Sequence, residues 1–198
     1  MRLAQPLPGV EAQRCFAPDL SYGRHFGPPP GNARSAAVVV LLYRRDGRWH
    51  LPLTVRPTTM LDHAGQISLP GGKIETGESS FDAALRELAE ELAVAPVMVS
   101  RLGTLTPLYL YNSNFMVAPW VVGASEPLVF QPNPGEVAEL IELPLSAIVD
   151  RSLRGTHRHR SRGVEVVVPH LAWQGHYIWG ATSMILGELA AICDDLAE

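Results

Sequence analysis

The segment from residue 72 to residue 92 constrains this chain most, because a glycine-containing loop there leads directly into a glutamate-rich helical pattern. Glu87, Glu90 and Glu91 stand at i, i+3 and i+4, on the flank of the apolar face of the expected helix. Like charges at that spacing repel by a few tenths of a kcal/mol per pair. A cation that takes oxygen ligands, such as Mg²⁺ or Mn²⁺, would remove the repulsion, and a solvated acidic surface is the alternative. The apolar face consists of Phe81, Ala84, Leu85, Leu88 and Leu92.

Two local features favour a ligand site over a solvated surface. Pro70, Gly71 and Gly72 permit unusual backbone angles and a close approach of main-chain carbonyls to a ligand. Ser79 and Asp82 have capping-box spacing, which predicts that the helix begins there and runs to about residue 93.

The same residues match the Nudix box, GX5EX7REUXEEXGU, in which U is a bulky apolar residue, so the chain resembles the Nudix hydrolases. Alanine stands at position 93, where the box has a glycine that ends the helix in left-handed geometry. If that geometry is kept, Ala93 costs about 1 kcal/mol. Alternatively, Pro96 ends the helix by biasing Ala95 away from helical angles. The matching positions are Gly72, Glu78, Arg86, Glu87, Leu88, Glu90, Glu91 and Val94.

The resemblance implies an enzyme that cleaves a diphosphate linked to another moiety, by attack of water on phosphorus. It implies that Glu87, Glu90 and Glu91 bind Mg²⁺ or Mn²⁺, with the main-chain carbonyl of Gly72 as a further ligand. Glu87 and Glu91 are thereby expected to be catalytic.

The resemblance also assigns supporting and proton-transfer roles. Arg86, which stays charged, orients the neighbouring carboxylates, and Glu78 supports them from further out. Family members take the general base either from the box or from a carboxylate on a later loop. Glu136, in the Pro- and Gly-containing loop at residues 133–137, is the leading later candidate, with Glu139 behind it; an exposed loop glutamate is the alternative.

Upstream of the box, residues 53–72 resemble the signature of coenzyme A (CoA) pyrophosphatases, LLTxR[SA]x3Rx3Gx3FPGG. Residues 176–182 likewise resemble that subfamily's aromatic-Trp-Gly-x-Thr segment. This resemblance implies hydrolysis of CoA or a derivative to 3′,5′-ADP and 4′-phosphopantetheine. Arg56 would contact phosphate, and His63 and Gly71 would line the substrate site. The signature positions that match are Thr54, Arg56, Gly65, Pro70, Gly71 and Gly72.

The signature is incomplete, because its first leucine, small residue, second arginine and phenylalanine are replaced by Pro52, Pro57, Leu61 and Leu69. Loss of that arginine removes a guanidinium group that could donate two hydrogen bonds to phosphate oxygens, including those of the 3′-phosphate of CoA. Two alternatives therefore stay open. One is cleavage of another nucleoside diphosphate derivative, such as ADP-ribose, NADH or a dinucleotide. The other is a nucleotide-binding module without catalysis, although such modules usually lack box glutamates that this chain retains.

Composition limits the partners of the chain. Its 198 residues and net charge of −4 suit a protein that is neither a general nucleic-acid binder nor a membrane-surface binder. The longest apolar run, residues 36–43, is too short to span a bilayer, and no signal peptide is recognisable. Cys15 and Cys193 suggest no disulfide framework. We therefore expect a cytoplasmic protein that acts on a small, CoA-like nucleotide diphosphate.

Residues 1–33 are predicted to form an N-terminal arm with a Pro/Gly connector at residues 27–31, and residues 34–198 the Nudix hydrolase domain. The arm packs either on its own domain or on a second subunit, so a homodimer is one candidate assembly. The basic run at residues 151–162 is expected to be a loop, either solvated or facing an anion. Its His157 and His159 lack a third ligand for zinc nearby in the sequence.

The remaining pattern is typical of an α+β protein, and the resemblance implies a Nudix-type α/β/α sandwich with a mixed β-sheet. A hairpin is expected around Asp46 and Gly47. The expected strands are residues 36–43, 49–55, 101–110, 115–124, 139–143 and 164–168, and the further helices are 145–150 and 182–196.

Overall fold

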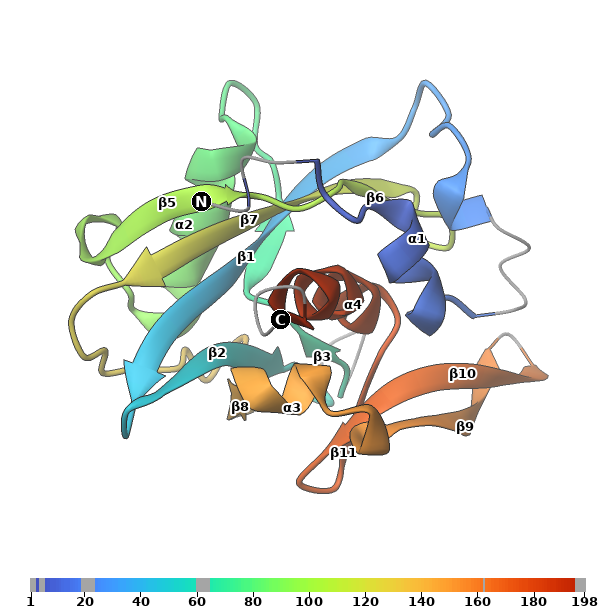
Figure 1. Cartoon of the computed structure of the whole chain (residues 1–198). Coiled ribbons are helices and arrows are strands. Elements are labelled where there is room, and N and C mark those ends of the chain that lie inside the picture. The colour runs from blue at the N-terminus through green and yellow to red at the C-terminus, as the bar shows by residue number, and fades with distance from the viewer. Residues whose placement is uncertain (1–2, 4–5, 19–23, 60–64, 162, 195–198) are drawn as a thin grey trace.

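The computed structural model describes residues 3, 6–18, 24–59, 65–161 and 163–194 (Figure 1). The strands β1 (Arg34–Arg45) and β2 (Arg48–Val55) form the predicted antiparallel hairpin. Asp46 and Gly47 close it with positive φ angles of 50° and 77°, which is the conformation that an Asp-Gly turn favours. None of the described helices is long and apolar enough to cross a membrane.

The hairpin belongs to a mixed sheet that contains eight strands within the described residues. The other six are β3 (Ile67–Ser68), β4 (Gly71–Lys73), β5 (Val99–Thr104), β6 (Leu108–Leu110), β7 (Phe115–Ala124) and β8 (Glu139–Pro144). The central order is β3-β2-β1-β7-β5, with β4 beside β1, β6 beside β7 and β8 beside β2. β1 and β7 are parallel, whereas the other pairings in this sheet are antiparallel.

Alternate residues of β1 face two separate cores, because successive side chains of a strand point to opposite faces. Val39 and Leu41 pack in the core that includes the helix α2 (Ser80–Leu92). Val40 packs in the other core, which includes the helix α4 (Ala181–Asp194). The sheet therefore lies between α2 and α4 (Figure 1), and the predicted α/β/α sandwich is confirmed.

The helix α2 begins as the sequence predicts, because Ser79 accepts a hydrogen bond from the amide of Asp82 at 3.1 Å. It ends at Ala93, which has left-handed angles (φ 57°, ψ 30°) and donates its amide to the carbonyl of Ala89. The left-handed end is therefore kept in spite of the alanine. The alternative, in which Pro96 ends the helix, is wrong; this proline begins the short helix η5 (Pro96–Met98).

The N-terminal segment packs on its own domain, which is one of the two partners that the sequence left open. Phe16 belongs to the core around α4, and the buried Gln13 donates from Nε2 to Glu188 of α4 at 2.9 Å. Glu188 is itself fully buried and also accepts bonds from the amide and hydroxyl of Thr106. The short helices of this segment are α1 (Val10–Gln13), η2 (Arg14–Phe16) and η4 (Arg24–Phe26). The domain boundary at residue 33 stays a prediction.

The strand expected at residues 101–110 is wrong in its extent, because it is two strands, β5 and β6. The register against β7 shifts between Arg101 and Gly103. Pro107, which has no amide proton to donate, then lies in the gap between the two strands.

The largest error concerns the basic run at residues 151–162. Its greater part forms β9 (Arg154–Ser161), which is antiparallel to β10 (Val164–Trp173), a strand longer than predicted. With β11 (His176–Trp179) they form a separate three-stranded sheet beside α4 (Figure 1). The helices α3 (Leu145–Val149) and η6 (Arg151–Leu153) precede it. The predicted end of the last helix, at residue 196, lies outside the described residues.

Candidate active site

The strand β4 places two glycines between β1 and α2. Gly72 pairs with Ala37 of β1, and a Cβ atom at Gly72 would overlap the carboxylate of Glu87. The amide of Gly71 donates to Oε1 of Glu91 at 3.4 Å, and a Cβ atom there would overlap the backbone of β1. Close approach therefore requires glycine at both positions.

Three carboxylates converge at this place, since oxygens of Glu87, Glu91 and Glu136 lie within 4.8 Å of one another. Glu136 comes from a turn that is fixed to the end of α2, because the amide of Asn133 donates to the carbonyl of Glu91 at 2.9 Å. The Asn133 side chain donates to Glu136 at 3.2 Å and accepts from the amide of Gly135 at 3.1 Å. Sequence reasoning missed Asn133, although Asn-Pro-Gly is a recognisable turn signal.

Glu91 is the most buried member of the cluster. Its residue is 4% exposed, and its Oε2 has no hydrogen-bond partner among the described residues. Burial raises the pKa of Glu91 to about 7; the charges of Glu87 and Glu136 add to this effect, whereas the Gly71 amide and the Thr54 hydroxyl oppose it. Burial also raises the pKa of Glu87.

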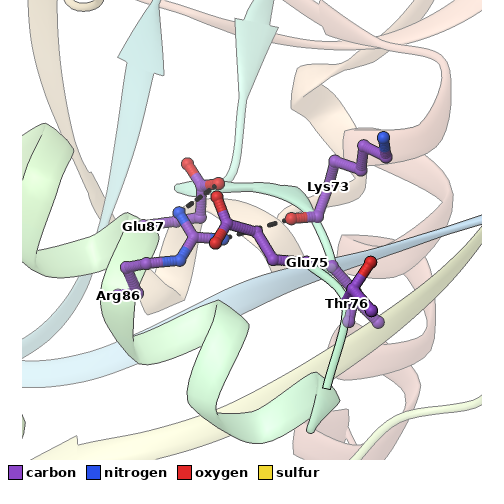
Figure 2. Close-up of a pocket in the computed structure, with 6 residues that line it drawn as sticks. Lys73, Glu75, Thr76, Arg86 and Glu87 are labelled. Carbon is purple, nitrogen blue, oxygen red and sulfur yellow. Dashed lines mark hydrogen bonds and ion pairs between the residues drawn. The ribbon is translucent and has the colours of Figure 1, made fainter. Parts of the chain in front are cut away.

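Arg86 holds the carboxylates that flank the cluster. Its Nε donates to Glu78 at 3.0 Å, and its Nη1 donates to Glu87 at 2.9 Å and to Glu90 at 3.0 Å. Its Nη2 reaches the carbonyl of Lys73 at 3.1 Å, so that Arg86 ties α2 to β4 (Figure 2). The bond to Arg86 lowers the pKa of Glu78. The side chain of Glu90 is half exposed and lies on Arg86, outside the three-carboxylate cluster.

An open groove of about 530 Å³ adjoins the cluster. Both a cation, Arg86, and a carboxylate, Glu87, face it (Figure 2). Its lining consists of Lys73, Ile74, Glu75, Thr76, Arg86 and Glu87. A groove with both signs of charge suits a polar ligand that reaches the carboxylates together with a cation.

The donor set fits a hard divalent cation, because such ions take carboxylate and carbonyl oxygens. Glu87, Glu91 and Glu136 offer three carboxylates at one place. The unpartnered oxygen of Glu91 and the raised pKa values of Glu87 and Glu91 indicate a cluster that ionises fully when a cation compensates its charge.

Of the residues predicted to bind substrate, Gly71 contacts this centre directly. Arg56 directly follows β2, and its Nε is buried without a hydrogen-bond partner among the described residues. His63 lies outside the described residues, and Gly71 directs its amide into the cluster. Thr182 of α4 donates from Oγ1 to the carbonyl of Ile67 at 3.0 Å. The two segments that resemble the CoA signature therefore adjoin each other.

Comparison with known proteins agrees with this geometry, because the model of the NUDIX domain matches residues 33–164. The chain belongs to the Nudix hydrolases. It is 39% identical over 162 residues to the uncharacterized Nudix hydrolase NudL of Enterobacter sp. (strain 638), covering 80% of this chain and 82% of that protein. NudL of Pectobacterium atrosepticum is 36% identical over 176 residues, which cover 84% and 86% of the two chains.

Solved structures share the Nudix fold at lower identity. The Nudix hydrolase RenU of M. smegmatis superposes with a TM-score of 0.56 at 16% identity, over 83% of this chain and 86% of RenU. A MutT/nudix family protein from Enterococcus faecalis gives 0.56 at 17% identity, over 88% and 68%. Membership of the Nudix hydrolases indicates that the chain hydrolyses diphosphate bonds, and Nudix enzymes generally use divalent metals for that reaction.

Proposed function

We propose that this Nudix hydrolase cleaves the diphosphate bond of CoA or of a CoA derivative. The products would be 3′,5′-ADP and 4′-phosphopantetheine or its acyl form. The convergence of Glu87, Glu91 and Glu136 beside an open groove carries the hydrolytic part of the proposal. The CoA part rests on the sequence signature around Arg56 and on the segment that leads into α4.

The arrangement of the two signature segments supports one substrate site built from both. β3 pairs with β2, with Thr54 opposite Ser68, and the Thr54 hydroxyl lies 3.2 Å from the Ser68 hydroxyl. The bond from Thr182 to Ile67 fixes β3 on its other side. Arg56 leaves β2 next to this junction, and its buried Nε, which has no hydrogen-bond partner among the described residues, is available to a phosphate oxygen.

We propose Mg²⁺ or Mn²⁺ as the cofactor, held by Glu87, Glu91 and the carbonyl of Gly72. Glu90 is a further ligand only if it leaves Arg86, on which it lies at 3.0 Å. When bound, such an ion neutralises charge on the phosphate oxygens and orients the attacking water. Arg86 keeps the carboxylates in place, because it bonds Glu78, Glu87 and Glu90 together.

We assign the general base to Glu136, with a box glutamate as the alternative. Water attacks phosphorus, its proton passes to the Glu136 carboxylate, and the bridging P–O bond breaks to release the second phosphate. The Asn133 side chain steadies this carboxylate at 3.2 Å. Glu136→Gln should remove most of the rate while Asp in its place restores part of it, whereas an unchanged rate would move the base into the box.

The deciding experiment is a substrate panel of CoA, an acyl-CoA, ADP-ribose, NADH and capped RNA, each with Mg²⁺ and with Mn²⁺. We expect the highest kcat/KM with CoA or acyl-CoA. A higher value with ADP-ribose or NADH would contradict the CoA assignment and retain the Nudix hydrolase. Loss of the signature arginine at Leu61 is the observation that favours this second outcome. Nucleotide binding without turnover of any diphosphate would support the non-catalytic module.

Two further predictions from the sequence accompany this function. We propose the cytoplasm as the compartment, because the CoA-like nucleotides of the proposed reaction suit it. A homodimer is proposed as the assembly to test by light scattering.

A further inference from the structure

The separate sheet of β9, β10 and β11 carries imidazole and aromatic rings on one face. Residues paired across an antiparallel ladder point to the same face. His157 pairs with Val168, and His170 pairs with Gly155 on one side and with Trp179 on the other. His157 and His170 are therefore diagonal neighbours on one face, far along the chain from the carboxylate cluster.

The two imidazoles face each other through the same atoms, with Nδ1 of His157 3.1 Å from Nδ1 of His170. Neighbouring rings hold both in place. The Tyr177 ring lies 4.1 Å from the His170 ring and is stacked on the His157 ring at 5.0 Å and 26°. His170 is 5% exposed, and a Cβ atom at Gly155 would lie 3.1 Å from its Nε2, so glycine leaves room for this ring.

The charge state of the pair leaves its nitrogens available. Burial lowers the pKa of His157 and of His170, and in His157 the neighbouring imidazoles add to the effect. Both rings are therefore neutral near pH 7. Arg158 lies one residue from His157 and so points to the opposite face, where it meets Glu165 at 3.4 Å.

We propose that His157 and His170 chelate a divalent transition-metal ion that prefers imidazole, with Zn²⁺ as the type ion. Zn–N bonds are about 2.0–2.1 Å, so two of them span about 2.9 Å at a right angle and about 3.3 Å at the tetrahedral angle. The observed 3.1 Å falls between these values, so the separation of the two nitrogens fits such a chelate. Each Nδ1 would give its lone pair to the metal, with the ring proton on Nε2 and water in the open positions.

This site differs in chemistry from the carboxylate cluster. Mg²⁺ and Mn²⁺ prefer oxygen ligands, whereas imidazole suits zinc, copper and nickel. Within the part of the chain that the structure describes, the group of three acidic or imidazole ligands is the glutamate cluster, so the histidine pair is a two-ligand chelate. Its competitor is a hydrogen bond between the two neutral rings, in which one Nδ1 keeps its proton.

Calorimetric titration with Zn²⁺ tests the proposal, in buffer with excess Mg²⁺ to occupy the glutamates. We expect about one equivalent to bind the full chain, and His157→Gln to weaken binding about tenfold or more, as the loss of a chelating ligand should. His159→Gln, which alters an imidazole on the same face outside the pair, is the matched control and should bind as the wild type does. Equal Zn²⁺ affinity in His157→Gln and wild type would overturn the site.

Electron paramagnetic resonance of bound Cu²⁺ gives a direct signature of the ligands. We expect hyperfine coupling to two nitrogens in the wild type and to one in His157→Gln. Circular dichroism confirms that the variant is folded. Absence of nitrogen coupling in the wild type would contradict the proposal and assign the pair to a hydrogen bond.

Discussion

The catalytic region, α2 with β4, and the sheet of β9 to β11 both gather titratable side chains, but they compensate them differently. In the catalytic region Arg86 bonds three carboxylates, while Glu91 is buried and its Oε2 has no hydrogen-bond partner among the described residues. In the sheet, the neutral rings of His157 and His170 place their Nδ1 atoms 3.1 Å apart. The first region therefore carries a buried carboxylate whose charge a cation would compensate, whereas the second carries neutral rings.

This difference indicates that the catalytic region accepts a cost in stability for function. An uncompensated buried carboxylate costs free energy in the folded state. Two neutral imidazoles bury no charge and so carry no such cost. Substitutions in the first region should therefore lower the hydrolytic rate without a matching loss of stability. Substitutions in the second region should leave the hydrolytic rate unchanged.

Glu91→Gln should have the largest effect, lowering kcat by on the order of 10³-fold, because a metal ligand contributes several kcal/mol of transition-state stabilisation. The fold should persist, since the amide keeps the shape of a buried side chain. Steady-state kinetics with Mg²⁺ and circular dichroism measure the two effects. His157→Gln in the other region is the matched control, with a rate near that of the wild type. A near-wild-type rate in Glu91→Gln would refute the metal role.

The pH dependence of stability should also separate the regions. Glu91 has a pKa of about 7 in the folded chain and an ordinary value of 4.5 when unfolded, so the folded state binds more protons between these pH values. The contribution of protonated Glu91 to stability is therefore complete below pH 4.5 and is lost as the pH rises to about 7. Over this range the free energy of unfolding falls by roughly 3 kcal/mol at most. Urea unfolding of the metal-free protein from pH 5 to pH 8 measures this loss.

The same titration has a clear control. Glu91→Gln carries no ionisable group at this position, so its stability should fall less over the same pH range and exceed that of the wild type at pH 8. Identical pH profiles of the two proteins would show that Glu91 is not the group responsible.

Gly72→Ala should lower kcat by roughly 100-fold, because the added Cβ atom would overlap the Glu87 carboxylate and displace it. The substitution adds one methyl group, so a loss of activity with little change in the circular dichroism spectrum would locate the effect in the site. Gly31→Ala is the matched control, since a Cβ atom there meets no atom within 4 Å. Equal rates for the two variants would contradict close packing of β4 against α2.

Local signals explain why the catalytic region was predictable. The helix follows from its apolar periodicity and from the Ser79–Asp82 cap, which are properties of neighbouring residues. The sequence also predicted Glu136 as one of two carboxylates from a later loop that could approach the box as the general base. What the sequence did not contain is the bond from Asn133 to Glu91 that fixes it, because this contact joins residues 42 positions apart.

Long-range pairing explains why the other region was mispredicted. β9 is rich in arginine and histidine, which are not typical of strands, and it becomes a strand because β10 supplies the ladder. The N-terminal segment illustrates the same limit, since Gln13 and Glu188 are 175 positions apart and each lacks a local signal for burial. Such contacts depend on the assembled fold.

Arg56→Ala should raise the KM for a phosphorylated substrate about tenfold with a smaller change in kcat, because a charged hydrogen bond to phosphate contributes about 1.5 kcal/mol of uniform binding. Arg160→Ala, an exposed arginine of β9, is the matched control from the other region. A similar rise in KM for Arg160→Ala would place part of the substrate on the β9–β11 sheet. An unchanged KM for Arg56→Ala would remove Arg56 from the site.

The smallest effect should come from the helix end at Ala93. Left-handed angles bring Cβ too close to the following carbonyl oxygen, so Ala93→Gly should raise the free energy of unfolding by roughly 0.5–1 kcal/mol. The gain is partly offset because glycine has more conformational freedom in the unfolded chain. Gln174, in the turn between β10 and β11, has a similar φ of 48° and gives the matched variant Gln174→Gly.

Urea unfolding at pH 5 measures the change in the free energy of unfolding for each of the two variants. Glu91 is largely protonated at this pH, so its charge does not contribute to the comparison. Equal increases in the free energy of unfolding would show that the strain of left-handed backbone angles is local and similar in the two regions. A gain at Gln174 without one at Ala93 would mean that the end of α2 has relaxed around its alanine. Since the amide of Asn133 donates to the carbonyl of Glu91, two residues before Ala93, such relaxation would also shift the turn that carries Glu136. The rate of Ala93→Gly would then change together with its stability.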